Sequence, residues 1–462
     1  MKKQLMVLSC VLLLLPGIVW AQKVDEEELF ADPNTVQTAP ADAPAQTPAA
    51  GQNPQGTNEG DIFSDQNTVV SVDTKTDEKV TDAVTQQATT FSGEISGNFG
   101  YDITRDALNG DADWGENPYT TAMKGDFLLD VRLNKGIKAF GDLWVIYSPK
   151  DEGDNAETEH FQNTLKELFL DVNLARKVYF RFGKQNLKWG RGYFWNPTDV
   201  ISEDRKSFND LNARLEGVYG LKMHVPFGVK YNIYGFLNAS GANKTKDFAF
   251  AGKFEALLPQ NIEMAVSAWK KQGALAVYGL DFATHKFKLD WRGEISLSYG
   301  DNRHRLTEQN GAYVDAQTED EWIPRVCLGF TKFFDAGNYT DRISVTGEFY
   351  YNQGGYTENM LAKADIRDRF LEDYFEPGNY GKYYAALFSS YSKFLVSKMT
   401  LNLNAIGNLS DASFILSPGI DYELANNASL SVTLSGYLGA QEREYTLSGN
   451  AFSAEVSVNL VF

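Results

Sequence analysis

The last segment of the chain, AFSAEVSVNLVF (Ala451–Phe462), alternates apolar and polar residues from end to end. Successive side chains of a β-strand point to opposite faces of a sheet, so a period of two indicates a strand with one apolar and one polar face. The apolar face carries Phe452, Ala454, Val456, Val458, Leu460 and Phe462. We therefore predict that the segment is an amphipathic strand with an aromatic last residue.

The same alternation recurs upstream, from Phe91 onward, for example in KFKLDWRGEISLSY over 286–299. The apolar residues of these segments do not recur at the three- and four-residue spacing of a helix. We count about eighteen such segments of about ten residues, the length that a tilted strand needs to cross a membrane. The sequence therefore predicts an all-β fold: a transmembrane antiparallel β-barrel of about 18 strands over residues 91–462, with about 16 strands as the alternative.

The connections between the predicted strands alternate in length. With the amino terminus placed in the periplasm, the even-numbered connections are short turns, such as 134–136 and 175–177. The odd-numbered connections are long, acidic and rich in Gly and Asn: 102–123, 149–164, 188–212, 300–321 and 354–380. Turns on one side and loops on the other are typical of membrane barrels. A soluble sandwich could share the alternation of residues but does not require this alternation of lengths.

The amino-terminal region differs in composition from the barrel. Residues 1–21 have the basic start, short apolar run and small residues of a secretory signal peptide. Residues 22–90 are rich in Ala, Pro, Gln and Thr, and we predict a disordered periplasmic segment. Within it ELFADPNTV recurs as DIFSDQNTV, either as two docking motifs for a periplasmic protein or as duplication within a linker. The motif positions are Phe30, Asp32, Asn34, Phe63, Asp65 and Asn67.

Composition excludes several classes of protein. A net charge of −18 disfavours nucleic acid as a partner, because a phosphate backbone requires an excess of Lys and Arg. Without the predicted signal peptide only Cys327 remains, so no intramolecular disulfide can form. The chain contains no His-Glu-x-x-His, Cys-x-x-Cys, Gly-x-Ser-x-Gly or phosphate-binding motif. We therefore expect no enzyme, no cofactor and no metal site.

The polar face of the predicted strands carries many charges of both signs. Such charges are costly in a dry core, which favours a water-filled lumen; the alternative is that paired charges rigidify a plugged barrel. We assign to the lumen Glu94, Asp130, Arg132, Glu167, Asp171, Arg181, Arg214, Glu216, Lys253, Glu255, Asp290, Arg292, Glu294, Arg342 and Glu348.

The stretch RFGKQNLKWGRGYFWNPTD (Arg181–Asp199) combines cations, aromatic residues and chain-breaking Gly and Pro. Its glycines allow tight backbone reversals, and Asn-Pro fixes an extended bend. The aromatic side chains are too apolar for a solvated loop, so they should pack against the barrel wall or surround the pore. Cations beside aromatic rings suit sugars or organic anions.

The pattern Arg-x-Gly-Lys-Gln-x-x-x-Trp-Gly-x-Gly followed by Asn-Pro-x-Asp resembles the signature of porin-like outer-membrane families, including the alginate-export type. The resemblance covers Arg181–Asp199 and the general barrel pattern. It implies that the third surface loop, 188–212, folds into the lumen as a constriction. The residues expected at this constriction are Arg181, Lys184, Lys188, Trp189, Arg191, Tyr193, Trp195 and Asp199. The alternative is a structural latch in which Asp199, Asp204 and Arg205 tie the loop to the wall.

The sequence thus predicts a channel integral to the bacterial outer membrane, with its amino-terminal segment in the periplasm, for passive or substrate-biased passage of small hydrophilic solutes. The aromatic carboxy terminus resembles that of outer-membrane barrels, which implies that the barrel-assembly machinery recognises Phe462. Two alternatives remain: a surface-exposed adhesin or structural barrel with a plugged lumen, and an export channel coupled to a periplasmic partner through 22–90.

Overall fold

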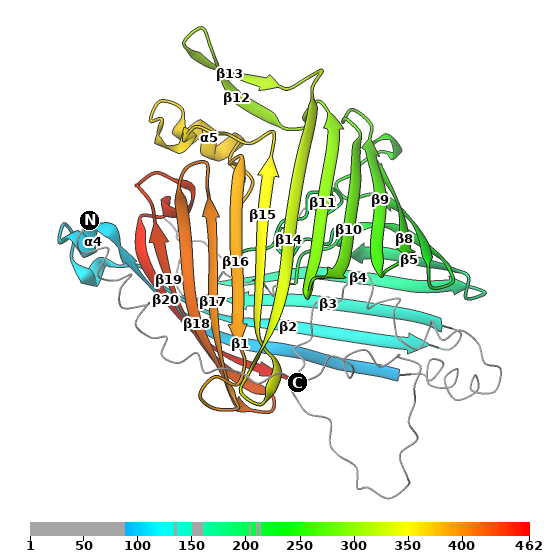
Figure 1. The fold of residues 1–462 in the computed structure, drawn as a ribbon, viewed down its shortest axis with the longest axis horizontal. Helices are drawn as coiled ribbons and strands as arrows, with labels where there is room; N and C mark the ends of the chain where they lie inside the picture. Colours follow the sequence, from blue (N-terminus) through cyan, green and yellow to red (C-terminus); the bar gives the residue numbers. More distant parts are fainter. Residues whose placement is uncertain (1–87, 134–135, 150–159, 203–204, 209–210, 212–213) are drawn as a thin grey trace, which may run out of the picture.

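The chain forms one closed barrel (Figure 1). In this computed structural model the sheet has 18 strands, and every neighbouring pair is antiparallel. The predicted fold class is therefore confirmed. The described residues are 88–133, 136–149, 160–202, 205–208, 211 and 214–462. The predicted signal peptide and the repeated motifs of 22–90 lie outside them.

The barrel strands follow one another in chain order around the sheet, apart from the β12–β13 hairpin, which forms a separate small sheet. Their bounds are β1 Ala88–Thr104, β2 Tyr119–Leu133, β3 Ile137–Tyr147, β4 Phe161–Leu174, β5 Val178–Gln185, β6 Val218–Phe227, β7 Tyr231–Asn238, β8 Ala249–Leu258, β9 Ile262–Lys271, β10 Val277–Lys286, β11 Leu289–Tyr299, β14 Trp322–Ala336, β15 Tyr339–Asn352, β16 Tyr383–Tyr391, β17 Met399–Asn408, β18 Ser413–Ala425, β19 Ala428–Leu438 and β20 Asn450–Val461.

The barrel closes where its first and last strands meet. β1 pairs with β2 on one side and with β20 on the other. The backbone of Phe462 exchanges two hydrogen bonds with Gly93, at 2.9 and 3.0 Å. The Phe462 ring lies 5.7 Å from the ring of Phe91 and 6.4 Å from that of Phe127. The aromatic last residue is therefore part of the seam.

The alternation of residues separates an apolar outer face from a polar lumen. On β1, Phe91 and Phe99 are 60% and 50% exposed on the outer face. Between them Glu94 and Asn98 point to the other side, where the Asn98 amide donates to Glu455 on β20 at 2.9 Å. Because the sheet is closed, this polar side is the interior of the barrel.

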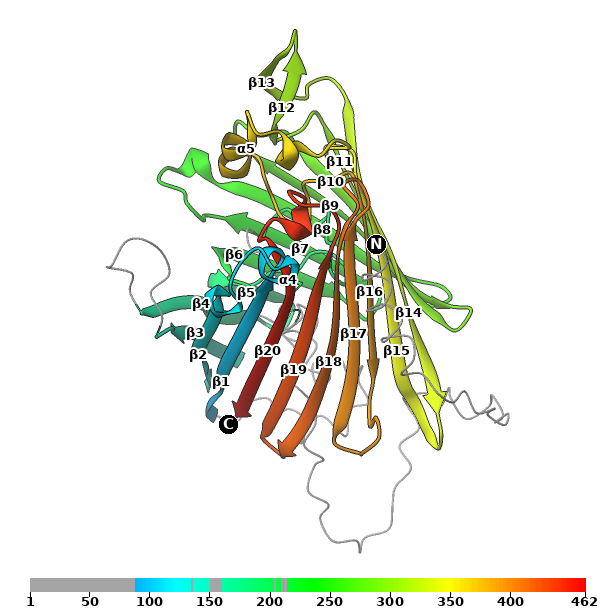
Figure 2. The ribbon, with the colours of Figure 1, turned by 90° about the vertical axis from the view of Figure 1, so that its left-hand side faces the viewer.

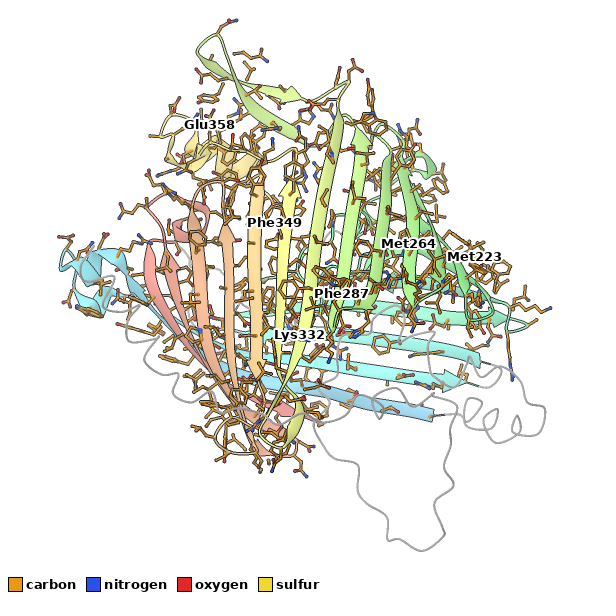
Figure 3. The ribbon with its side chains drawn as sticks, viewed as in Figure 1. Met223, Met264, Phe287, Lys332, Phe349 and Glu358 are labelled. Atoms are coloured by element: carbon orange, nitrogen blue, oxygen red, sulfur yellow. The ribbon has the colours of Figure 1, made fainter. Side chains whose placement is uncertain are left out.

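Two belts of exposed aromatic residues border the outer face. One belt lies at the loop end of the barrel, where the long connections emerge: Tyr119, Tyr147, Phe161, Tyr219, Tyr278, Tyr299, Trp322 and Tyr383. The other lies at the opposite turn end: Phe91, Phe227, Tyr231, Phe287, Phe333, Phe334, Tyr339 and Phe462. Figure 3 labels Phe287 at the turn end and Phe349 between the belts. An apolar band between aromatic girdles is the surface of a barrel that spans a membrane.

The turn-end connections are tight. At 260–261 and at 287–288 both residues have positive φ, between 54° and 67°, as a type I′ hairpin turn requires. The predicted alternation of lengths is wrong at two loop-end connections, 272–276 and 409–412, which are also short. At the second, the side-chain oxygen of Asn408 accepts a hydrogen bond from the Ser410 backbone at 2.8 Å and closes the chain into a turn.

The connections 300–321 and 353–382 form a folded structure that we call the cap. It contains the hairpin β12 (His304–Gln309) and β13 (Ala312–Gln317) and the helix α5 (Arg367–Asp373), none of which the sequence predicted. Figures 1 and 2 place these elements beyond the loop end of the strands. Leu306, Leu361 and Phe370 are almost fully buried in its core. No helix among the described residues is long and apolar enough to cross a membrane.

The shorter elements are the α-helix α4 (Arg105–Asn109) and the 3-10 helices η2 (Trp114–Glu116), η4 (Thr245–Asp247), η5 (Met360–Ala362) and η6 (Glu444–Thr446). One strand boundary differs from the prediction in a way that affects the site. The sixth strand begins at Val218 and not at residue 213, because Gly217 donates its backbone N–H to Lys166 on β4 at 3.0 Å, beyond the end of β5. Residues 214–217 therefore belong to the loop.

Candidate functional site

Residues 186–217, which we call the lumen loop, connect β5 to β6 and reach across the interior of the barrel. The loop begins beside β4, where Asn186 donates its backbone N–H to Glu167 at 2.7 Å. It then contacts the inward side chains of β8, β9, β10, β11 and β15. The described part of the loop is therefore bonded to inward side chains of strands from β4 to β15.

Two glycines allow the loop to approach the wall. A Cβ at Gly190 would lie 2.5 Å from a carboxylate oxygen of Glu294, and a Cβ at Gly192 would lie 1.9 Å from the backbone oxygen of Trp195. Real Cβ atoms do not make contacts this short, so Gly192 requires glycine, whereas a side chain at Gly190 would displace the Glu294 carboxylate that binds the loop. Gly190 therefore allows close packing of the loop against Glu294 of the wall, and Gly192 allows close packing of the loop against its own backbone.

Two wall carboxylates bind the loop through its backbone. Glu348 on β15 accepts from the N–H groups of Tyr193, Phe194 and Trp195 at 2.6, 3.0 and 2.7 Å. Glu294 on β11 accepts from the N–H groups of Gly192 and Thr198, and from the Thr198 hydroxyl at 2.8 Å. Consecutive backbone N–H groups directed at one carboxylate form an anion nest, here filled by the protein itself.

A third anchor is an ionic one. The Arg191 guanidinium lies between carboxylates of three strands: it donates to Asp281 on β10 at 2.7 Å, to Glu255 on β8 at 2.6 Å and to Glu263 on β9. The positive charge of Arg191 is therefore paired with carboxylates of the barrel wall. Arg191 anchors the tip of the loop to the wall.

The aromatic residues of the loop pack against the wall. The Trp195 ring stacks on Tyr350 at 5.6 Å and donates its indole N–H to the carbonyl of Gly378 at 2.8 Å. Trp189 is 1% exposed in a cluster that includes Val218 and Phe236. Both tryptophans are anchors, so they do not face the solvent in the lumen.

Three cations near the loop have no carboxylate partner within 4.0 Å among the described residues: Lys188, Lys206 and Arg292. Lys188 donates to the carbonyl of Gly192 at 2.9 Å, and Lys206 donates to the next carbonyl, that of Tyr193, at 2.7 Å. The Tyr193 ring has the Lys206 ammonium 5.0 Å from its centre and the Arg292 guanidinium 5.9 Å away. We call these three residues the cation cluster.

The members of the cation cluster are partly exposed and act on one another. Burial, and then the nearby charges of Lys188 and Arg292, lower the pKa of Lys206 to about 8. Burial also lowers the pKa of Lys188. Each ammonium has three donors and uses one in a described hydrogen bond, so donors remain for a solute.

The remaining residues expected at the constriction lie elsewhere. Arg181 is fully buried in the wall, where it donates to both oxygens of Asp171 at 2.6 and 2.7 Å. Lys184 lies in register with Leu168 and Tyr219, which are exposed on the outer face, and pairs with Glu216. The register therefore directs Lys184 toward the outer face, and Glu216, which was expected in the lumen, contacts Lys184.

The hypothesis of a latch is supported in a different form from the one expected. Asp199 is buried and its side chain accepts from the backbone of Ser202 at 3.3 Å, within the loop. Arg205 donates to the Asp199 carbonyl and lies 4.0 Å from Glu376 in the cap. Asp204 lies outside the described residues. The loop is held by carboxylates of the wall, and Asp199 stabilises its internal turn.

The other expected lumen charges are mostly paired. Lys138 and Arg132 bind Asp130 at 3.0 and 3.5 Å. Arg214, on the loop, reaches Asp126 at 3.6 Å and Asp142 at 3.4 Å. The Lys253 ammonium lies 5.8 Å from the Trp189 ring. Asp290, near the turn end, contacts His285 at 2.6 Å.

Sequence reasoning missed several residues of this site. Asp281 and Glu263 lie on predicted strands, and the period of two would have found both. Lys206 lies in a loop without periodicity, so no sequence signal placed it beside Tyr193.

Comparison with known proteins extends the description of the fold. No family model matches this chain, and no curated protein matches its sequence. Among solved structures, OccK8 (OprE) of Pseudomonas aeruginosa shares 7% identity with a TM-score of 0.51, covering 81% of this chain and 98% of that one. A BenF-like porin from Pseudomonas fluorescens Pf-5 shares 8% identity with a TM-score of 0.50, covering 81% and 98%. At this level of identity the similarity is one of fold.

Proposed function

We propose that this protein is an outer-membrane channel through which small hydrophilic solutes pass, with the lumen loop forming its constriction. The proposal starts from a closed barrel whose fold is similar to that of two porin-type structures. A lipid-facing apolar band and two aromatic belts favour integration in a membrane. A barrel of 18 strands is wider than side chains alone can fill.

The inward charges support a wet lumen. Lys253, Glu255 and Arg292 are only partly buried although they point inward. Ionised groups in a dry interior would cost several kcal/mol each, so partly exposed ones indicate contact with water.

The observation that carries the proposal is the attachment of the lumen loop. Its backbone N–H groups are bound by Glu294 and Glu348, and its Arg191 by three further carboxylates. These carboxylates are engaged by the loop, whereas the cation cluster has no carboxylate within 4.0 Å among the described residues. We therefore infer a channel that is biased toward anionic solutes, although the protein as a whole has a net charge of −18.

Planar-bilayer recordings with the purified full-length protein test the channel. We expect discrete conductance steps and a reversal potential that indicates anion preference in a salt gradient. A barrel that inserts, and that migrates as folded protein on unheated gels, yet stays electrically silent would contradict the proposal. Membrane fractionation tests the location, with the protein expected in the outer-membrane fraction.

The plugged-adhesin alternative is favoured by one observation, the packed cap over the loop end. Deleting the cap hairpin, residues 304–317, separates the two functions. A channel should keep its conductance, whereas an adhesin should lose surface binding while its permeability stays negligible. The export alternative depends on residues 22–90, and capture of a periplasmic protein by that peptide tests it.

A further inference from the structure

A cavity of about 200 Å³ lies at the loop end of the lumen, apart from the cation cluster. One side is formed by residues 200–202 of the lumen loop, and the other by the ends of β7, β8 and β9. Its polar lining includes Asn238, Asp247, Trp269 and Lys271. A solute coming from the loop end would meet this cavity beside the constriction.

Strand register explains the hollow. Asn238, Ala249 and Lys271 lie side by side across β7, β8 and β9, and all three line the cavity. The short side chain of Ala249 leaves space between the longer side chains of Asn238 and Lys271. Trp269 lies two positions along the same inward face of β9, so its ring borders the hollow.

The cavity is rich in donors that the described residues do not use. The Trp269 indole N–H and the Lys271 ammonium have no acceptor among the described residues. The Asn238 oxygen accepts from the Ser240 backbone at 2.8 Å, which leaves the amide N–H₂ group without a described acceptor. One carboxylate oxygen of Asp247 accepts from the backbones of Asn243 and Lys244, at 3.3 and 3.0 Å. Its other oxygen makes no described hydrogen bond.

We propose that this cavity is a subsite for one neutral sugar ring of hexopyranose size. Several donors and one carboxylate oxygen suit a ligand with many hydroxyls, and an indole ring suits the apolar face of a sugar. One ammonium and one carboxylate give no net charge, so the subsite does not favour an ion. The volume is below the range of about 300–1,000 Å³ for drug-sized ligands, which fits a single ring.

The subsite deepens the proposed function, because it gives a channel a binding step before its constriction. Saturation-transfer NMR on the detergent-purified full-length protein tests it without any need for conductance. The probes are D-glucose, D-galactose and D-mannose, each measured separately. We expect transfer to the ring protons of at least one of them.

Variants locate the binding. Ala249→Leu fills the hollow and Trp269→Ala removes the ring, and each should reduce the transfer signal by about fivefold or more. Ala268→Leu is the control for Ala249→Leu, because Ala268 is an exposed alanine on the outer face of β9, the strand that carries Trp269. If Ala249→Leu does not fold, Lys271→Met against Lys270→Met provides the same comparison, since Lys270 is exposed and bonded to the Ala274 carbonyl.

The following outcomes distinguish a failure of the subsite from a failure of the channel. Absence of transfer for all three sugars, or transfer that is equal in every variant, overturns the subsite. Tighter binding of D-glucuronate than of D-glucose also overturns it, since the ligand class would then be anionic. If the protein conducts current but binds no sugar, the channel is supported and the subsite is refuted. If the unmodified protein binds a sugar but conducts no current, and the cavity variants lose the binding, the subsite is supported and the channel is refuted.

Discussion

At the scale of single residues, the positive charges near the lumen loop have two different environments. Arg191 is surrounded by Asp281, Glu255 and Glu263 and acts as an anchor. Lys188 and Lys206 are bonded to backbone carbonyls, which neutralise no charge. Substituting Arg191 should therefore disturb the position of the loop, whereas substituting the lysines should change the field that a solute meets.

The double substitution Lys188→Ala with Lys206→Ala tests this field. We expect the permeability ratio of chloride to potassium to fall by a factor on the order of three, because two positive charges leave the constriction. The reversal potential in a potassium chloride gradient measures the ratio. Lys246→Ala, an exposed lysine of the loop-end connection, is the control and should leave the ratio unchanged. An unchanged ratio in the double variant would exclude the cation cluster as the source of selectivity.

The pKa of Lys206 predicts a pH dependence. A lysine with a pKa of about 8 loses its proton as the pH rises from 7 to 9, whereas one with its ordinary value near 10.5 stays charged. Anion preference should therefore decrease across this interval. Lys206→Arg keeps its charge and should remove the decrease. Reversal potentials at pH 7, 8 and 9 measure it, and the same slope in both proteins would refute the assignment to Lys206.

At the scale of elements, the lumen loop is held by carboxylates of the barrel strands, among them Glu294 and Glu348. Glu348→Gln tests this attachment, since the amide lacks the charge that three backbone N–H groups share. We expect the loop to lose on the order of 2 kcal/mol of attachment, with larger and noisier conductance and faster cleavage of the loop by protease.

Single-channel recordings and limited proteolysis measure these effects. Glu308→Gln, on the exposed hairpin of the cap, is the matched control and should resemble the unmodified protein. Quiet channels of unchanged conductance in Glu348→Gln would show that other contacts are sufficient to hold the loop.

The barrel strands could be predicted from the sequence because a closed barrel repeats one rule. Each strand places apolar residues outward and polar residues inward, so the period of two is visible in 286–299 and in 451–462 alike. The cap obeys no such rule. Leu306 and Phe370 become buried by contacts between 300–321 and 353–382, which are distant in sequence.

The candidate site could be predicted only as a segment. The glycines and tryptophans of 181–199 indicated a compact loop, but the roles of its charges depend on their partners. Arg191 resembles Lys188 in sequence, yet three carboxylates on separate strands surround Arg191 alone. The outward direction of Lys184 follows from the period of two itself, because Lys184 lies three residues after the inward Arg181 and in register with the outward Leu168.

At the scale of the whole molecule, closure depends on pairs between the first and last strands. Phe462→Ala removes ring contacts with Phe91 and Phe127 at the seam. We expect a smaller fraction of folded, heat-modifiable protein on gels, and an unfolding midpoint lower by a few degrees, since a lost aromatic contact costs about 1 kcal/mol or more. Phe250→Ala is the control, because Phe250 is 61% exposed on β8, away from the seam.

An equal folded fraction in the two variants would contradict a special role of the last residue. Recognition of Phe462 by the assembly machinery is a separate prediction. Refolding of Phe462→Ala with and without that machinery distinguishes the two effects. Loss of the seam contact should lower the folded fraction in both cases, whereas loss of recognition should lower it only when the machinery is present.

The seam also joins strands that are far apart in the chain. β1 is among the first barrel residues to be translated, and one of its two partner strands is among the last, since β1 pairs with β20. The nascent chain therefore has to carry an unsatisfied strand edge through synthesis and export. A chain that ends before β20 would leave two unpaired strand edges, and exposed edges of this kind promote aggregation.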